Sequence, residues 1–377
     1  GGSNGAAVGA VPVGAADPPG VKRPVVIFVP GGGWRQHGRF RPFGLNVGLA
    51  RTLAKRGFVV AMTSYRLRGA RLFGMLPLYV VMAAVASAIL MPALWAAYGV
   101  GLRFWLGGLM APAGFLLFWH WLGWACNHGR VHHPGQLEDT AAAIAHIRAT
   151  VDAHGGDPAN VFVVGQSAGA HIVAMLALHP ELFDVHGVHG GLAHTNGFRG
   201  IVLLSPVAAP AAFLDTNVLS DRGEAARRRR CGAVLQDSLI HFLYPAFSSK
   251  LGHATEFNRC FPLRAAYDLG NAGIRSLQLP PTLILTTSGE FFIDTGVNAL
   301  SLLLHNSDVD VHRYHILNAD HGSYMFDADI SAKDGERVVV PLLARFMIRC
   351  LLGEPARTLP PPDDDDRGVD DVSLPMV

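Results

Sequence analysis

Short apolar runs and longer mixed runs alternate along most of the chain. The apolar runs are rich in Val, Ile and Leu, and most carry no charge, which is typical of strands buried on both faces of a sheet. These runs lie at 25–30, 59–65, 161–166, 200–205, 282–287 and 309–317. Helix-like stretches lie between them, at 44–56, 137–153, 168–179, 296–306 and 337–352. This alternation predicts an α/β fold with a mostly parallel central sheet, helices on both faces, and ligands bound at the carboxyl ends of the strands.

One long stretch interrupts this alternation. No Asp, Glu, Lys or Arg occurs over 72–102, and after Arg103 a second uncharged run continues to residue 126. Each run exceeds the roughly 20 residues that span the apolar core of a bilayer, and neither has the polar stripe of a soluble helix. Aromatic residues cluster where the runs meet and at their far end, as they do at membrane interfaces. The sequence predicts a transmembrane helical hairpin, about 73–97 and 104–125, within an insert at 71–128.

The charges around this hairpin predict its orientation. A hairpin returns the chain to the side it left, and its base is flanked by Arg66, Arg68, Arg71 and Arg130, whereas Arg103 stands alone at its tip. Because basic residues favour the cytoplasmic side, we expect the rest of the protein to face the cytosol from an endomembrane such as the endoplasmic reticulum. Membrane lipids are then among its partners. The alternative interpretation is a pair of buried helices in a soluble cap.

The remaining composition sets the domain boundaries. Residues 1–21 are rich in Gly, Ala and Pro, and residues 353–377 are Pro-rich and acidic, so both segments are predicted to be disordered. Between them, one large catalytic domain is predicted at 22–70 and 129–352, since half of the chain is hydrophobic and suffices for its core. Within it, 207–280 shows no clear strand order and is predicted to be a cap over the functional edge.

Charge and cysteine content exclude some functions. A net charge of +2 gives no indication of a nucleic-acid partner. The four cysteines lack the spacing of a zinc or redox site. The chemistry predicted below also implies neither a metal nor an organic cofactor. The oligomeric state is left open.

The stretch VFVVGQSAGAH at 161–171 contains the pattern G-x-S-x-G, from Gly165 to Gly169. The pattern alone is weak, but here a strand precedes it and a helix follows it, as a nucleophile elbow requires. Such a turn projects Ser167 above the sheet, at the start of a helix whose dipole favours developing negative charge. Ser167 is therefore the predicted nucleophile, while His171, one helical turn later, is expected to be structural.

A serine hydroxyl is a poor nucleophile unless a base takes its proton. In enzymes built on such an elbow, an acid and then a histidine follow the serine along the chain. His321 comes after the last predicted parallel strand and is the predicted base. Asp294 comes after the preceding strand and is the preferred acid, with Glu290 and Asp320 as alternatives.

Three glycines follow the first strand, in VVIFVPGGGW at 25–34. Acyl transfer builds negative charge on the substrate oxygen, and each backbone N–H aimed at that oxygen is worth roughly 3 kcal/mol. Since side chains would obstruct this approach, the N–H groups of Gly32, Gly33 and Ala168 are predicted to form an oxyanion hole. A tight turn with positive φ is the plainer alternative. Two further residues in these stretches are predicted to contact the substrate, Trp34 and Gln166.

These motifs together resemble the α/β-hydrolase superfamily, in its hormone-sensitive-lipase-like and small-carboxylesterase branch. PGGGW resembles the HGGGW oxyanion motif, and GQSAGAH resembles the GxSAGG-type elbow. SYRL at 64–67, HPGQLEDTAAAIAHI at 133–147 and GGDPANVFVVGQSAGAH at 155–171 resemble connecting segments of that branch in order. The sequence departs from the pattern at Pro30, where many relatives have histidine, at GEFFID, which replaces a shorter G-x-x-D, and at the apolar insert.

The resemblance implies a serine carboxylesterase that acts through an acyl-enzyme on a small-molecule or lipidated ester. GQSAGAH and the apolar insert look most like isoprenylcysteine α-carbonyl methylesterases, which implies a prenylcysteine methyl ester as substrate. One alternative is an arylformamidase-like amide hydrolase. Another is a catalytically inactive hydrolase fold that acts as a membrane-bound binding protein.

Overall fold

The computed structural model describes residues 22–34, 47–66, 131, 133–209, 259–289, 296–320, 339–353 and 369–371. The chain divides into two compact units, one made of Gly1–Tyr65 with His133–Val377 and the other of Arg66–His132. Every helix and strand named below belongs to the first unit. The predicted membrane hairpin lies outside the described residues, and none of the helices within them is long and apolar enough to cross a bilayer.

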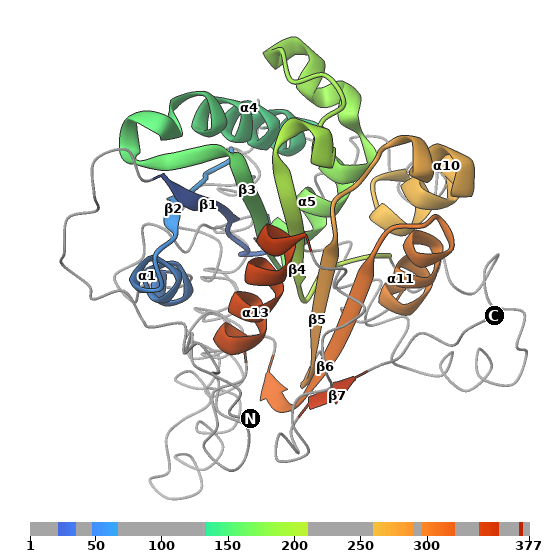
Figure 1. The fold of residues 1–377 in the computed structure, drawn as a ribbon. Coiled ribbons are helices and arrows are strands. Elements are labelled where there is room, and N and C mark those ends of the chain that lie inside the picture. Colours follow the sequence, from blue (N-terminus) through green and yellow to red (C-terminus); the bar gives the residue numbers. More distant parts are fainter. Residues whose placement is uncertain are drawn as a thin grey trace, which may run out of the picture. The chain divides into compact units, whose positions relative to one another are not determined.

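A seven-stranded sheet with the order β2-β1-β3-β4-β5-β6-β7 forms the centre of the first unit (Figure 1). The strands are β1 (Arg23–Val29), β2 (Val59–Met62), β3 (Gly156–Gln166), β4 (Phe198–Leu204), β5 (Thr282–Gly289), β6 (Val311–Asp320) and β7 (Val369–Asp371). Strands β1 to β6 run parallel, and β7 pairs antiparallel with β6. The predicted α/β fold with a mostly parallel sheet is therefore confirmed.

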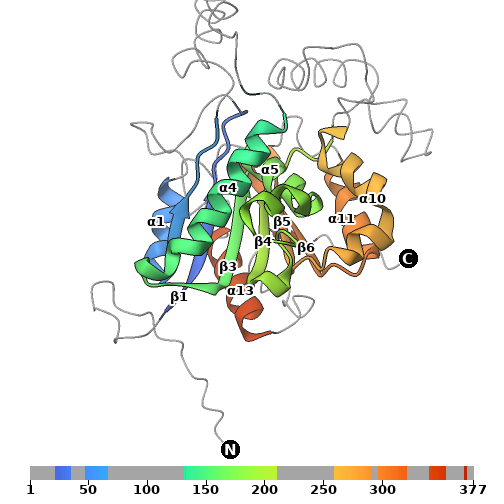
Figure 2. The same ribbon diagram turned by 90° about the horizontal axis from the view of Figure 1, so that it is seen from above.

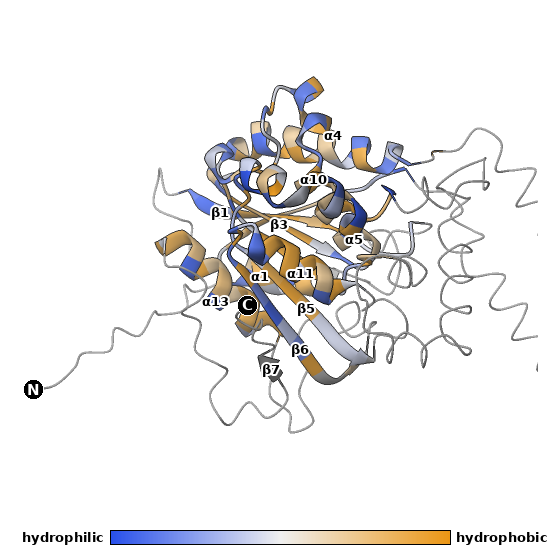
Figure 3. Ribbon diagram, turned by 90° about the vertical axis from the view of Figure 1, so that its right-hand side faces the viewer, coloured by the Kyte–Doolittle hydropathy of each residue, from blue (hydrophilic) through white to orange (hydrophobic). Residues whose placement is uncertain are grey.

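Helices cover both faces of the sheet (Figures 1 and 2). One face carries α4 (Gly135–Thr150), α5 (Ala168–Leu178), α10 (Pro262–Ser276) and α11 (Val297–Asn306). The other face carries α1 (Val47–Lys55) and α13 (Val339–Leu352). Three 3-10 helices complete the described connections, η2 (Val151–His154), η3 (Pro180–His186) and η4 (His194–Asn196). Figure 3 shows hydrophobic residues running along α13, whereas both kinds of residue alternate around α4 and α10.

The helix α5 is the most enclosed element of the described fold. All of its residues, from Ala168 to Leu178, are buried. It packs on β3 and β4 and is flanked by α4 and α10, so that neither side of the helix faces water. A helix that is hydrophobic all round is stable in such a position. The element that follows the predicted nucleophile is therefore fixed by the core.

The chain reverses its winding direction between β1 and β3. From β1 the chain moves through α1 to the edge strand β2, and it then returns across β1 to form β3 on the other side. In open α/β sheets, ligands bind outside the carboxyl ends of the strands at such a switch point. The topology therefore indicates a site above the ends of β1 and β3.

Strand β3 is longer than its apolar pattern predicts. It begins at Gly156, because Gly156 and Asp157 pair with Arg23 and Pro24 before the register shifts at Pro24/Val25. The pairing uses backbone groups, so it takes in a polar segment, GDPAN, that has no strand pattern of its own.

The C-terminal segment differs from the expectation of a wholly disordered tail. Residues 369–371 form β7, in which Val369 pairs with Ile316 and Asp371 with Tyr314. The strand β6 offers an open edge of backbone donors and acceptors, and any extended segment can pair with such an edge. The prediction of disorder is therefore wrong for these three residues.

The predicted cap at 207–280 also needs correction at its C-terminal end. Pro262–Ser276 forms α10, which packs against α5 and α11 as part of the helical layer. The segment 210–258 lies outside the described residues. Its flanks are joined, since the Leu263 N–H donates to the Ala208 carbonyl at 3.0 Å.

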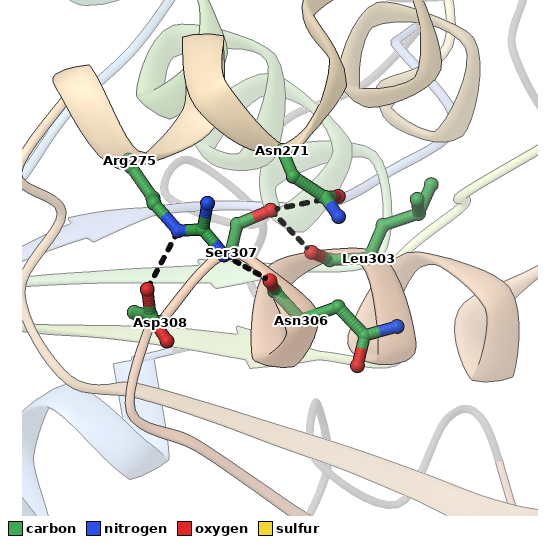
Figure 4. A network of polar contacts seen from close by, with 6 residues as sticks. All are labelled: Asn271, Arg275, Leu303, Asn306, Ser307 and Asp308. Atoms are coloured by element: carbon green, nitrogen blue, oxygen red, sulfur yellow. Dashed lines mark hydrogen bonds and ion pairs between the residues drawn. The ribbon is translucent and has the colours of Figure 1, made fainter. Parts of the chain in front are cut away.

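Polar contacts hold α10 to the turn between α11 and β6 (Figure 4). The Arg275 guanidinium contacts the Asp308 carboxylate, with 2.6 Å between Nε and Oδ2, and donates to the Asn306 carbonyl at 3.0 Å. The Ser307 hydroxyl lies 2.6 Å from the Leu303 carbonyl and 3.2 Å from the Asn271 amide oxygen. These contacts fix the turn that leads into β6, the strand that ends just before His321.

Candidate active site

The glycine loop and the elbow lie at neighbouring strand ends. Val29, the last residue of β1, pairs with Gly165 of β3, so the chain leaves both strands at the same edge of the sheet. Residues 31–33 follow β1, and Ser167 follows β3. The structure thus brings together two motifs that are more than a hundred residues apart in the sequence, at the switch point of the sheet.

Ser167 forms a strained turn between β3 and α5. Its backbone angles are φ 53° and ψ −118°, in a region that costs a non-glycine residue about 1–3 kcal/mol and is often found at functional sites. The turn is held by the Ser167 N–H, which donates to the Leu204 carbonyl at 2.8 Å. The residue is 8% exposed. This is the geometry that the G-x-S-x-G pattern predicts for a nucleophile elbow.

Two glycines of the elbow let neighbouring backbone approach. A Cβ on Gly169 would lie 2.1 Å from the Val29 carbonyl oxygen, and a Cβ on Gly165 would lie 2.6 Å from the Ala170 Cα. Any side chain at either position would separate α5 from the ends of β1 or β3. The glycines of the motif therefore close the elbow against the glycine loop.

The glycine loop lies directly against the elbow. A Cβ on Gly31 would meet the Ser167 Cβ at 2.9 Å. Gly32 and Gly33 have φ of 121° and 59°, a region that glycine occupies without strain. The loop thus approaches the elbow closely at Gly31 and has positive φ at Gly32 and Gly33. Its role as an oxyanion hole stays a prediction.

The first N–H groups of α5 face the same edge of the sheet. The first four N–H groups of any helix have no acceptor within the helix, and Ala168 is the first residue of α5. The positive end of the helix dipole is therefore next to Ser167. Gly32 and Gly33 directly follow Gly31, whose position contacts Ser167. The assignment of their N–H groups and that of Ala168 to an oxyanion hole stays a prediction.

Tyr65 is a residue of the site that the sequence did not reveal. It follows β2, is 4% exposed, and donates its hydroxyl hydrogen to the Pro30 carbonyl at 3.0 Å. Burial raises the pKa of its phenol well above the usual range, so the donor hydrogen stays in place. The only sequence signal for Tyr65 was its position in SYRL, directly after the strand that pairs with β1.

The other end of the glycine loop is held by aromatic packing. Trp34 has φ 58°, an unusual value for a bulky residue, and the residue is 3% exposed. Its ring meets the ring of His171 edge to face, with 5.2 Å between the centroids. The described contacts of Trp34 are thus in the protein interior, and its predicted contact with substrate stays a prediction.

His171 is a structural residue. Its Nε2–H donates to the Cys260 carbonyl at 2.8 Å, and its ring packs edge on against Phe261 at 5.6 Å between centroids. Complete burial lowers its pKa to about 3. Nearby, burial also lowers the pKa of His133 to about 4, with a smaller contribution from His179. Both imidazoles are therefore neutral at the pH at which hydrolases commonly work.

Gln166 occupies the last position of β3 and is 0% exposed. A Cβ on Gly31 would lie 2.1 Å from its Oε1, so its side chain lies against the glycine loop. The sequence predicts that Gln166 contacts the substrate. Its burial places it against the loop instead, and direct contact with a substrate stays a prediction.

The predicted base and acid lie outside the described residues, as does the alternative acid Glu290. Their strands are described: β5 ends at Gly289, β6 ends at Asp320, and these two residues are paired. The chain therefore leaves both strands side by side, just before Asp294 and His321 in the sequence. The assignments of these two residues stay predictions.

Comparison with known proteins decides the family. A family model described as the alpha/beta hydrolase fold matches residues 130–325, which is more than half of the chain. The chain belongs to the α/β hydrolases. The resemblance carried by GQSAGAH is thereby confirmed, while the glycine loop of this α/β hydrolase precedes the matched range.

Two curated relatives of this α/β hydrolase match over short stretches. One is a probable isoprenylcysteine alpha-carbonyl methylesterase of Oryza sativa subsp. japonica, 36% identical over 93 residues, which are 23% of this chain and 20% of the relative. The other is the esterase LipQ of Mycobacterium tuberculosis, 40% identical over 63 residues, which are 15% of either chain. The chain thus spans a fifth or less of the length of the curated relatives it matches.

Solved esterase structures share the fold of this α/β hydrolase. Inhibited esterase B from Lactobacillus rhamnosis is 16% identical, with a TM-score of 0.51 over 90% of this chain and 82% of the other. Esterase Est22 is also 16% identical, with a TM-score of 0.50 over 88% of this chain and 72% of the other. At such identity the likeness concerns the fold alone.

Proposed function

We propose that this α/β hydrolase is a serine carboxylesterase with Ser167 as its nucleophile. The observation that carries the proposal is the contact between the Ser167 elbow and the glycine loop 31–33 at the ends of β3 and β1. A nucleophile beside exposed backbone donors is the arrangement that acyl transfer requires. Ester hydrolysis is further supported by the two curated relatives, which are named a methylesterase and an esterase.

The proposed reaction has two halves. The Ser167 Oγ attacks the ester carbonyl carbon while His321 accepts the hydroxyl proton, and the N–H groups of Gly32, Gly33 and Ala168 stabilise the resulting oxyanion. The intermediate expels the alcohol, which takes the proton from His321 and leaves the acyl group on Ser167. Water then loses a proton to His321 and attacks the acyl carbon. The second intermediate collapses and releases the acid, while the Ser167 Oγ takes the proton back from His321, which restores the free enzyme.

An acid orients the imidazole in this mechanism, and Asp294 is the proposed residue, with Glu290 as the alternative. The pairing of Gly289 with Asp320 supports the proposal, because the segments that follow β5 and β6 begin next to each other. An acid delivered after β5 and a histidine delivered after β6 therefore start from neighbouring points. The carboxylate would hold one tautomer of His321 and stabilise its positive form.

The proposed substrate class is a lipidated ester, namely a prenylcysteine methyl ester at a membrane. Two observations support it: the stretch of similarity to the methylesterase and the uncharged runs within the insert 71–128. The prenyl chain of such a substrate lies in the bilayer, so an enzyme associated with membrane lipids would meet it there. The arginines around the base of the insert support a catalytic domain on the cytosolic side of an endomembrane.

Covalent labelling with a fluorophosphonate tests the nucleophile. Wild-type protein should be labelled and should hydrolyse p-nitrophenyl esters, while Ser167→Ala should do neither. Ser301→Ala is the matched control, because it removes a buried serine from α11 that bonds only to its own helix among the described residues. Equal labelling of Ser167→Ala and wild type would disprove the assignment. A folded wild type that no probe labels would favour an inactive binding protein.

A panel of substrates tests the proposed ester class, and a deletion variant tests the proposed membrane association. Prenylcysteine methyl ester, short acyl esters, long-chain glycerides and N-formylkynurenine should be compared with the full chain in lipid vesicles. The proposal expects the highest kcat/KM for the prenylcysteine ester, and it expects a variant that lacks 71–128 to leave the membrane fraction. A preference for N-formylkynurenine would assign the protein to amide hydrolysis instead.

A further inference from the structure

The side-chain amide of Gln166 is an unusual feature of the site. The residue is 0% exposed, and neither its Oε1 nor its Nε2 has a hydrogen-bond partner among the residues that the structure describes. Burying an amide without partners costs about 1–3 kcal/mol. Such groups are rare in folded proteins, and when they occur beside a functional site they point to a role there.

The amide lies where it can act on the oxyanion loop. A Cβ on Gly31 would lie 2.1 Å from the Gln166 Oε1, 2.6 Å from its carbonyl oxygen and 2.9 Å from the Ser167 Cβ. Gly31 is therefore packed between the side chain of Gln166 and the elbow. The amide is next to both parts of the site and is sealed from water.

The loop has backbone freedom that the amide can use. Glycine occupies positive and negative φ about equally well, and two consecutive glycines, Gly32 and Gly33, follow the contact at Gly31. A peptide plane between such residues can rotate at little cost. In a trans peptide the C=O and the N–H point in opposite directions. If a loop carbonyl turns toward Gln166, the N–H of the same peptide turns away from it, toward the substrate side.

We propose that Gln166 is a positioning residue that orients the oxyanion loop. Its Nε2–H donates to a carbonyl of the loop 31–33 when the loop rotates, and this rotation aims a loop N–H at the oxyanion. The inference rests on the proposed function, with Ser167 as nucleophile. Because the bond forms as the loop rotates, Gln166 contributes to the transition state more than to substrate binding.

Gln166→Met tests this role, since methionine has a similar length but no hydrogen-bonding groups. We expect kcat for p-nitrophenyl acetate to fall about 10- to 100-fold, by comparison with the loss of an oxyanion donor, while KM stays nearly constant. The melting temperature should stay equal or rise, because the variant removes an unpaired buried amide. Gln136→Met is the matched control, as it removes another buried glutamine, from α4, and it should keep kcat.

Gln166→Glu gives a second readout that a structural role would not produce. A neutral carboxyl group can still donate one hydrogen bond, whereas an ionised carboxylate cannot donate at all. We therefore expect kcat of this variant to fall as pH rises, through an ionisation that is absent from the wild-type profile. A pH profile that superimposes on that of the wild type would overturn the proposal, even if Gln166→Met did not fold.

The outcomes separate this inference from the proposed function. If wild type reacts with the fluorophosphonate at Ser167 and Gln166→Met keeps a kcat equal to that of wild type, only the role of Gln166 is disproved. A Gln166→Met variant with a lower melting temperature and an unchanged kcat would also disprove only the positioning role, since the amide would then be structural. If wild type is not labelled at all, the proposed function itself fails.

Discussion

The indole of Trp34 and the imidazole of His171 meet edge to face, with 5.2 Å between their centroids. His171 also donates to the Cys260 carbonyl and packs on Phe261. One buried imidazole therefore connects the end of the glycine loop to the segment that leads into α10. The orientation of the loop depends on this connection as well as on its own glycines.

Removing the indole should weaken both the fold and the site. Trp34→Ala is expected to lower the free energy of unfolding by about 3–5 kcal/mol, as for other large aromatic residues in a core, and to lower kcat because the loop loses its anchor. Trp34→Phe keeps an aromatic edge near His171, so its free energy of unfolding and its kcat should both fall less than those of Trp34→Ala. Urea unfolding and ester hydrolysis measure these effects. Equal stability of the alanine variant and wild type would contradict the packing described here.

The buried histidines predict a loss of stability in acid. The pKa values of His171 and His133 in the folded protein are lowered to about 3 and about 4, below the usual 6.5 or so of an unfolded chain. Below pH 6.5 or so the unfolded state binds more protons, so the free energy of unfolding falls by about 1.4 kcal/mol per pH unit for each histidine. The contribution of the two histidines to the free energy of unfolding is fully present above that pH and declines as pH falls toward 4.

Urea unfolding at pH 7 and pH 5 measures this dependence. In His171→Phe the loss of unfolding free energy between pH 7 and pH 5 should shrink to about half, because one of the two histidines with a lowered pKa is gone. His305→Phe is a suitable control, since it removes a histidine of α11 that is only partly buried. If His171→Phe loses as much unfolding free energy between pH 7 and pH 5 as wild type does, the pH dependence comes from other groups.

A methyl group on the glycine loop should damage the site. Gly31→Ala would place its Cβ 2.1 Å from the Gln166 Oε1 and 2.9 Å from the Ser167 Cβ, so the loop must move away from the elbow. Since displaced oxyanion donors cost about 10²–10³ in kcat, a loss approaching that range is expected. Gly187→Ala is the control: its φ of 72° makes alanine strained, yet no atom lies within 4 Å of the new Cβ. The control should lose stability and keep kcat.

Tyr65 should position the loop from its other end. Tyr65→Phe removes the hydroxyl that donates to the Pro30 carbonyl and leaves that buried oxygen unsatisfied, at a cost of about 1–3 kcal/mol. We expect lower thermal stability and a lower kcat with a similar KM for short esters. If kcat and the melting temperature both match those of wild type, the hydrogen bond does not hold the loop.

The alternation of apolar runs and helices predicted the parallel sheet, because strands buried on both faces must be apolar throughout. The segments that escaped prediction are not apolar throughout. The first residues of β3, GDPAN, have no strand pattern, and two of the three residues of β7 are aspartates. They are strands because Arg23, Pro24 and the edge of β6 provide backbone partners. No local pattern encodes a partner that lies far away in the sequence.

The site shows the same division. Ser167 and its glycines were predictable, because a sharp turn between strand and helix needs small residues at fixed spacing. The contribution of Tyr65 was not, since it depends on the neighbouring strand that brings its hydroxyl to Pro30. Likewise, the burial of Gln166 depends on the loop that covers it. The residues of α10 were assigned to a cap because the segment 207–280 shows no clear strand order, and packing against α5 and α11 decides their place.

The hydrogen bond between Leu263 and Ala208 gives the protein a modular plan. The chain departs from the framework after β4 and rejoins it beside the point of departure, so the described flanks of 210–258 meet at one closed junction. A protein engineer can change the sequence between these flanks without having to move Ala208 and Leu263 apart. Selectivity for one ester over another could then diverge among related proteins faster than the framework that performs the reaction.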